Sequence, residues 1–173
     1  MIITIGGSAA SGKTTLARKL ARILKYKHIS AGGIMREMAA ERGQSLMEFS
    51  RYAEKNPKVD VEIDRRQIKL ARGNCVVDGR LSAYFIKADL KIWLTATVEV
   101  RARRIKNRDN FKTLKDAVKH IKLRESSERK RYMRIYGIKH PDLGRYDIIL
   151  DTGKFGINAT IDVIAKAVET MRR

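Results

Sequence analysis

Eight residues near the start of the chain have the types and spacing of a phosphate-binding loop. The segment Gly7-Ser8-Ala9-Ala10-Ser11-Gly12-Lys13-Thr14 matches the P-loop pattern G-x-x-x-x-G-K-[ST]. Its glycines allow backbone N–H groups to curl around phosphate oxygens, and the helix that follows adds the positive end of its dipole. Lys13 would reach the β- and γ-phosphates of a nucleoside triphosphate, and the Thr14 hydroxyl would ligate Mg²⁺. We therefore predict a nucleoside triphosphate site that extends from Gly7 to Thr15.

Two further motifs stand where apolar runs end. Ser30, Gly32 and Arg36 follow one predicted strand; the glycine permits close backbone approach to a ligand, and the arginine would clamp a phosphate. Asp78 and Arg80 end another strand; the carboxylate would hold Mg²⁺ through water, and the guanidinium would bind the phosphate of an acceptor. The plainer alternatives are a helix cap at Ser30 with a solvated Arg36, and a strand-ending turn at Asp78.

Five arginines are spaced so that they share helix faces. Arg101, Arg104 and Arg108 recur three and four residues apart, and Arg124 and Arg131 are seven apart. A phosphoryl group in transfer carries charge on three oxygens, and water must be kept away from it. Two arginine clusters on either side of a short break therefore predict a lid that closes over the phosphates.

Other interpretations of this basic stretch remain open. Glu125 and Glu128 stand among the arginines, so the segment can also be a solvated helix with internal salt bridges. Between residues 101 and 134 there are fourteen Lys or Arg and four Asp or Glu, which also suits a surface for RNA. Base stacking on RNA requires interleaved aromatic side chains, and this stretch holds only Phe111 and Tyr132. Nucleic acid is therefore the less favoured partner.

The elements that must position these residues alternate between short apolar runs and helical patterns. This alternation predicts a three-layer α/β domain, with a five-stranded parallel sheet and helices on both faces. Ligands bind beyond the carboxyl ends of such strands, where the motifs fall. The expected strands are Met1–Ile5, His28–Ser30, Cys75–Asp78, Leu90–Leu94 and Asp147–Leu150. The expected helices are 16–24, 98–107, 113–134 and 157–172, together with a helix-rich insertion over about 34–72 that breaks at Gly43 and at Asn56-Pro57.

Composition sets the remaining limits. A chain of 173 residues suits one domain with a real core. Cys75 is the only cysteine, so no disulfide forms within the chain, and a cytoplasmic protein is expected. No apolar run is long enough to span a membrane, and no signal peptide is visible. The net charge of +19 indicates polyanionic ligands. We expect a monomer whose partners are small molecules.

The motifs together resemble cytidylate kinase of the archaeal type, in the P-loop nucleoside monophosphate kinase family. The matching segments, which span nearly the whole chain, are the P-loop, S-A-G-G-x-x-R at 30–36, D-G-R at 78–80, R-x-x-R-x-x-x-R at 101–108 and R-x6-R at 124–131. The resemblance implies a P-loop kinase fold that transfers a phosphoryl group directly from MgATP to CMP or dCMP. It implies an acceptor-binding insertion at 33–72 and a lid at 104–134. It further implies that Arg104 and Arg108 bind ATP, that Lys13, Arg124 and Arg131 are catalytic, and that Ser30, Gly32, Arg36 and Arg80 bind the acceptor.

One position departs from the family pattern. Bacterial members carry D-G-R-D, whose last aspartate helps to recognise cytosine, and here that position is Leu81. Base recognition must then come from the insertion, where Asp60, Asp64 and Arg65 are the candidates, with Asp64 preferred. A carboxylate accepts from the exocyclic amine of cytosine, but it would accept from that of adenine too. AMP and UMP therefore remain alternative acceptors.

Overall fold

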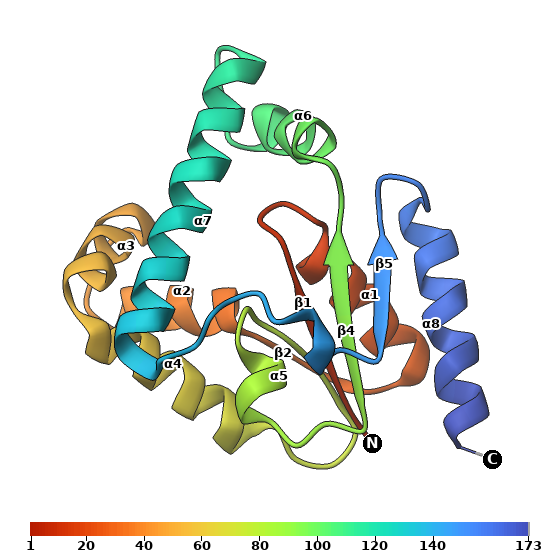
Figure 1. Ribbon diagram of the computed structural model, residues 1–173. Coiled ribbons are helices and arrows are strands. Elements are labelled where there is room, and N and C mark those ends of the chain that lie inside the picture. The colour runs from red at the N-terminus through yellow and green to blue at the C-terminus, as the bar shows by residue number, and fades with distance from the viewer. Residues whose placement is uncertain (173) are drawn as a thin grey trace.

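The sheet is parallel throughout and supports the site at one edge. The computed structural model describes residues 1–172. Five strands lie in the order β2-β3-β1-β4-β5 (Figure 1). All four neighbouring pairs are parallel. The strands are β1 (Ile2–Gly7), β2 (Lys27–Ser30), β3 (Cys75–Asp78), β4 (Leu90–Thr95) and β5 (Ile148–Asp151). Each of the five predicted strands is present: the bounds of β3 are as predicted, and those of the other four differ by one or two residues.

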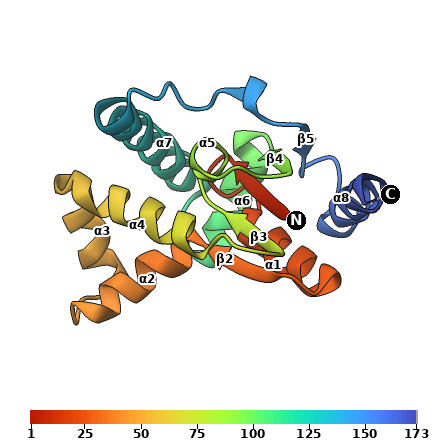
Figure 2. The ribbon, with the colours of Figure 1, turned by 90° about the horizontal axis from the view of Figure 1, so that it is seen from below.

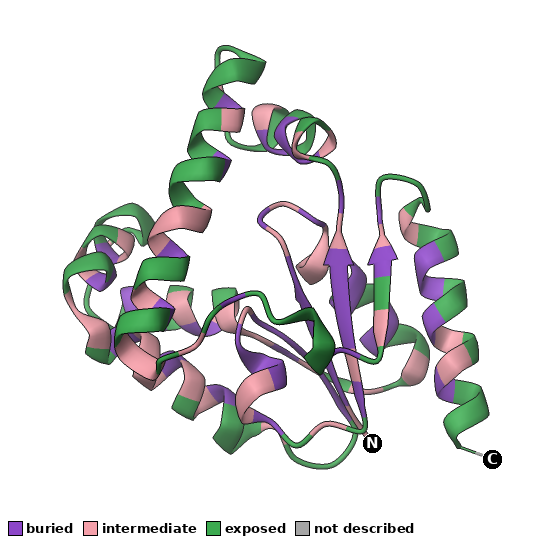
Figure 3. Ribbon diagram, viewed as in Figure 1, coloured by how far each residue is buried: buried purple, intermediate pink, exposed green. Residues whose placement is uncertain are grey.

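The central strands are apolar because both faces of the sheet are covered. Ile3 and Ile5 of β1 and Ile92 of β4 are fully buried, as expected for a parallel sheet between layers of helices. Figure 3 shows β4 buried along most of its length. The register places Ile5 opposite Asp78 on one side and Ile92 on the other, so the P-loop and the end of β3 emerge at the same edge.

Helices cover both faces of the sheet, which confirms the three-layer α/β prediction. On one face α1 (Lys13–Leu24) and α8 (Ile157–Met171) pack Leu16, Leu20 and Ile164 against the strands. Figure 2 shows these two helices on the side of the sheet opposite α7 (Leu114–Tyr136) and the short α5 (Ser82–Phe85). A second core joins β2 and β3 to the three helices between them: α2 (Ala31–Glu41), α3 (Leu46–Lys55) and α4 (Pro57–Leu70).

Local signals in the sequence set the ends of these three helices. Ser30 caps α2 by accepting from the Gly33 N–H. Ser45 and Glu48 form a capping box at the start of α3. Pro57 opens α4, where its fixed φ suits the first helical position. The breaks near Gly43 and at Asn56-Pro57 therefore fall where the sequence predicts them.

The arginine-rich segment forms two helices. They are α6 (Val98–Arg108) and α7, each capped by a threonine hydroxyl, and α7 ends at Gly137 in the left-handed conformation. Figure 1 shows the long α7 extending beyond the sheet, with α6 crossing near its upper end. Within residues 1–172, none of the helices is both long and apolar enough to cross a membrane. The sequence did not predict two short elements, α5 and a 3-10 turn, η1 (Leu143–Arg145).

Candidate active site

The P-loop connects the end of β1 to the start of α1 and has the curvature of an anion-binding loop. Ala10 and Gly12 have φ values of 60° and 93°, the left-handed backbone that occurs in anion-binding concavities. Gly7 has a φ of 151°, and a Cβ there would collide with the backbone oxygen of Leu94 and lie 2.7 Å from the Ser11 hydroxyl. Only glycine fits this position. The geometry is therefore that of a phosphate cradle, with Thr15 exposed on the first turn of α1.

Lys13 lies folded back on its own loop. Its Nζ donates to the carbonyl oxygens of Gly7 and Ser8 at 3.0 and 2.9 Å. Burial lowers the pKa of Lys13 well below its usual value, and the neighbouring Arg80 guanidinium lowers it further. Arg80 also donates to the Gly7 carbonyl, at 2.6 Å. The side chains of Lys13 and Arg80 therefore meet at the Gly7 carbonyl, which forms the floor of the cradle.

Beside the cradle, the carboxylate of Asp78 contacts three side chains. Asp78 Oδ2 accepts from Thr14 Oγ1 at 2.7 Å and from Ser30 Oγ at 3.3 Å, and Asp78 Oδ1 lies 2.6 Å from His28 Nε2. Gln67 holds the strand end in place by donating to the Asp78 carbonyl at 3.1 Å. The Thr14 hydroxyl and the Asp78 carboxylate lie side by side at the phosphate cradle, and both are hard oxygen ligands that fit Mg²⁺. The assignment of Mg²⁺ to these two residues stays a prediction.

Two carboxylates of α7 face the same loop. Glu125 Oε1 accepts from the Ala9 N–H at 3.0 Å and from Arg101 Nη1 at 2.6 Å. Glu128 is buried and binds the fork of Arg80, with N–O distances of 2.9 and 3.0 Å, while Arg124 Nε donates to it at 3.0 Å. Burial alone would raise the pKa of Glu128, but Arg80 and Arg124 together lower it below its usual value. The alternative of a solvated, salt-bridged helix therefore holds only in part: the internal pair Arg124–Glu128 forms, but Glu128 is buried and not solvated.

The three candidate arginines of α6 go to three different places. Arg101 is buried and also donates to the carbonyl oxygens of Ala96 and Ala9, at 3.0 and 3.1 Å. Arg104 reaches the P-loop side, where it donates to the hydroxyl and carbonyl of Thr152 at 2.9 and 2.7 Å. Arg108 is exposed and forms a two-pronged pair with its neighbour Asp109 at 2.6 and 2.7 Å. The structure therefore brings Arg104 to the P-loop side and leaves Arg108 outside it, because the Arg108 guanidinium pairs with Asp109.

The two candidate arginines of α7 also diverge. Arg124 lies over Glu128 near the loop, whereas Arg131 pairs with Asp60 of α4 at 3.1 Å. The side chains of Arg131 and Asp60 are 18% and 13% exposed, so this pair is largely shielded from water. Burial raises the pKa of Asp60, and Arg131 offsets part of that rise. Arg131 is accordingly held toward the helical insertion and not toward Lys13.

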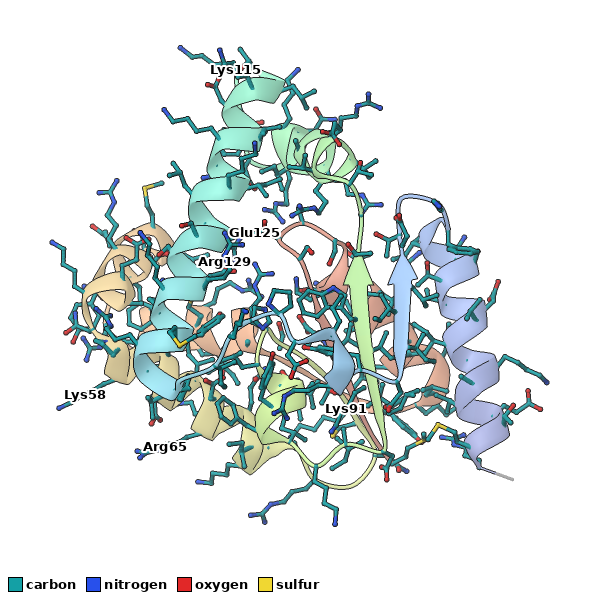
Figure 4. All side chains as sticks on the ribbon, in the orientation of Figure 1. Lys58, Arg65, Lys91, Lys115, Glu125 and Arg129 are labelled. Atoms are coloured by element: carbon teal, nitrogen blue, oxygen red, sulfur yellow. The ribbon has the colours of Figure 1, made fainter. Side chains whose placement is uncertain are left out.

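The remaining candidates lie on the insertion. Asp64 Oδ2 accepts from the Tyr136 hydroxyl at 2.7 Å, and burial raises the pKa of Asp64 to about 6. Arg36 is exposed on the first turns of α2, beside Gly32. Leu81 is buried in the core, so it offers nothing to a base. Arg65 projects outward from α4, away from the rest of the molecule (Figure 4). Asp60 and Asp64 thus face α7, and Arg65 does not.

Sequence reasoning missed several residues that complete this arrangement. His28 stands two residues before Ser30 on the same strand, so strand alternation places both on the face that Asp78 occupies. That spacing was an available signal. Gln67 and the contact between Glu125 and the P-loop depend on packing between segments far apart in the chain, for which the sequence carries no local signal.

Comparisons with known proteins agree with the geometry. Residues 2–154 match the model of the cytidylate kinase-like family. The chain is 45% identical to a cytidylate kinase of Methanocaldococcus jannaschii, over 100% of both chains. It is 46% identical to a cytidylate kinase of Pyrococcus furiosus, over 98% of this chain and 88% of the other.

Solved structures agree in fold. A shikimate kinase from Bacteroides thetaiotaomicron superposes with a TM-score of 0.67 at 16% identity, over 98% of each chain. A shikimate kinase from Aquifex aeolicus gives 0.61 at 19% identity, over 99% of this chain and 98% of the other. Identities this low show a shared P-loop kinase architecture alone. Since the family model covers most of the sequence and the two relatives above are aligned over 98% or more of this chain, the chain belongs to the cytidylate kinase-like family.

Proposed function

We propose that this nucleoside monophosphate kinase transfers the γ-phosphoryl group of ATP to CMP, and also to dCMP, by direct in-line displacement. The observation that carries the proposal is the phosphate cradle, with Lys13 on its floor and the Thr14–Asp78 pair beside it, facing an arginine-bearing helix. Full-length relatives named cytidylate kinase support the choice of acceptor. The transfer needs positioning and charge neutralisation, and it needs no covalent intermediate.

The donor side follows from the P-loop. Its backbone N–H groups would hold the β-phosphate, and Lys13 would turn from the Gly7 and Ser8 carbonyls to the β- and γ-phosphates. Thr14 and Asp78 would hold Mg²⁺, which when bound neutralises phosphate charge and orients the γ-phosphoryl group. Arg104 lies beside Thr152 at the rim of the loop, where its flat guanidinium suits contact with the nucleoside of ATP.

The arginines of the predicted lid, residues 104–134, would neutralise the transferring group. Arg124 of this lid is already held at the loop by Glu128, as is Arg80, which lies outside the lid and would bind the phosphate of the acceptor. Arg131 and Arg108 are held by Asp60 and Asp109, so they reach the phosphates only after these pairs open. Closure of the lid on both substrates would supply that rearrangement and would exclude water.

The acceptor would bind between the helical insertion, residues 33–72, and α7. Ser30, Gly32 and Arg36 stand at the start of α2, where a monophosphate would meet an exposed guanidinium and a helix N-terminus. Asp64 lies deeper, against Tyr136, and its carboxylate would accept from the exocyclic amine of cytosine. Uracil presents a carbonyl at that position, which the carboxylate would repel.

The same proposal places the enzyme in the cytoplasm as a monomer. Cys75 is the only cysteine, and it is buried in the core. The fold therefore depends on no disulfide within the chain, which suits a reducing compartment.

A coupled assay of ADP release tests the proposal. CMP, dCMP, UMP, AMP and GMP are compared as acceptors with MgATP as donor. We expect CMP and dCMP to be preferred over UMP by at least about tenfold in kcat/KM, because a carboxylate left unpaired against a carbonyl is costly. Equal use of UMP, or a clear preference for AMP, would overturn the choice of acceptor. No turnover of any of the five monophosphates would overturn the kinase proposal as a whole.

A further inference from the structure

The carboxylate of Glu125, on α7, accepts a hydrogen bond from a backbone N–H group of the phosphate cradle. Glu125 Oε1 lies 3.0 Å from the Ala9 nitrogen, although the two residues are 116 positions apart. Figure 4 shows Glu125 on the side of α7 that faces the loop, whereas Lys115 lies at the far end of the same helix. The N–H groups of a P-loop point at phosphate oxygens when a nucleotide is bound. A carboxylate oxygen is of the same chemical kind, since it is an anionic acceptor.

The electrostatic setting explains why an anion is held there. Lys13, Arg80, Arg101 and Arg124 surround the loop, and like charges gathered at low dielectric repel one another. Glu125 binds Arg101, and the next glutamate on the same face, Glu128, binds the other two arginines. The α7 helix therefore supplies to the loop the negative charge that phosphates would otherwise bring.

We propose that Glu125 is an internal substitute for a phosphate, which ATP must displace, and that it thereby sets the affinity for ATP. This inference rests on the proposed binding of ATP at the P-loop. In the nucleotide-free protein, Glu125 holds α7 against Ala9. The triphosphate takes over the Ala9 N–H and Arg101, and the freed carboxylate is repelled from the site by the charge of the phosphates.

A purely structural role for Glu125 predicts the opposite change in ATP affinity. If its function were to anchor Arg101, removing its charge would loosen the loop and weaken ATP binding. Arg101 does not depend on Glu125 alone, because it also donates to the carbonyl oxygens of Ala96 and Ala9. The substitution Glu125→Gln keeps the side-chain shape and one acceptor oxygen. The two roles are therefore separated by the sign of the change in ATP affinity.

The experiment measures binding of a non-hydrolysable ATP analogue with Mg²⁺ by calorimetry, without acceptor. For Glu125→Gln we expect the Kd to fall at least about tenfold. Tenfold corresponds to about 1.4 kcal/mol, which is about the difference between a hydrogen bond to a charged acceptor and one to a neutral acceptor. Glu99→Gln is the matched control: it removes the same charge from an exposed position on α6 and should leave the Kd within about twofold.

The outcomes distinguish this inference from the proposed function. Binding by the wild type, with an unchanged or higher Kd in a folded Glu125→Gln protein, overturns the inference and leaves ATP binding intact. An equal fall in Kd in both variants also overturns it, because general charge then explains the gain. If the wild type binds no analogue at millimolar concentration, the proposed ATP site is itself wrong. Should Glu125→Gln not fold, Glu125→Asp is measured instead; its shorter side chain draws back from Ala9, and we expect the same direction of change.

Discussion

The buried carboxyl of Asp64 makes stability depend on pH in a direction that can be calculated. Asp64 lies on α4 against the Tyr136 hydroxyl of α7, and burial raises its pKa from 3.8 to about 6. The hydrogen bond from Tyr136 opposes that rise, and the nearby Asp60 adds to it. The folded protein therefore holds a proton on Asp64 at a pH where the unfolded chain has lost it.

The sign and size of this change in stability follow from proton linkage. Between about pH 4 and pH 6 the folded state binds more protons than the unfolded state, so stability falls as the pH rises. One pKa unit is worth about 1.36 kcal/mol, so the shift from 3.8 to about 6 destabilises the wild type by about 3 kcal/mol above pH 6. The variant Asp64→Asn has no such charge to bury. We expect it to match the wild type near pH 4 and to be more stable at pH 8 by up to about 3 kcal/mol.

Thermal unfolding from pH 4 to pH 8 measures this difference. For a chain of this size, 3 kcal/mol corresponds to a rise in Tm of about 6–12 °C. Asp109→Asn is the control with the opposite sign, because Arg108 lowers the pKa of Asp109 and its removal should not stabilise the protein at pH 8. Equal Tm values for wild type and Asp64→Asn across the whole range would refute the reasoning, since Asp64 would then be ionised at no cost.

Two further changes test the catalytic assignments. Lys13→Ala should lower kcat by at least about 10³-fold, because it removes a preorganised charge from the transferring group; full activity in a protein with native circular dichroism would contradict the assignment. Arg131→Ala should lower kcat far more than it changes the KM for ATP, the pattern of a contact made in the transition state. A triple alanine variant at the exposed Lys112, Lys115 and Lys119 should keep wild-type turnover. A different pair of results would indicate a nucleic-acid surface instead. In that case Arg131→Ala keeps wild-type turnover, and the wild type binds RNA tightly in a complex that weakens about 10³-fold from 50 to 200 mM salt and that the triple variant no longer forms.

The elements and the P-loop could be predicted because their signals are local. A run of β-branched residues, a glycine loop and a helical repeat lie next to one another in the first 24 residues, and each specifies its own backbone. The same holds for the capping residues Ser30 and Ser45 and for the break at Pro57. Helix α5 was missed because a single helical turn is too short to show a periodic pattern.

The partners of the charged side chains could not be predicted, because they are chosen by packing across the fold. Spacing placed Arg124 and Arg131 on one helix face, but spacing does not tell which residue each one meets. Arg124 pairs with Glu128, and Arg131 pairs with Asp60 of α4. The predicted convergence of both arginines on one phosphoryl group therefore remains a prediction about a closed state with substrates bound.

The contact between the P-loop and the lid region has an apolar part that explains how it can be both specific and reversible. Ala9 packs with Ala102, Ile105, Ala117 and Ile121 in a small cluster between the loop, α6 and α7. The loop contributes to this cluster only the methyl groups of Ala9 and the partly buried Ala10, so the loop itself buries little apolar surface there, and stabilisation follows the area buried. Two polar pairs must then supply much of the attraction that holds α7 to the loop: Glu125 with the Ala9 N–H, and Glu128 with Arg80, which also donates to the Gly7 carbonyl. A triphosphate acts on those pairs directly, which makes the position of α7 sensitive to nucleotide.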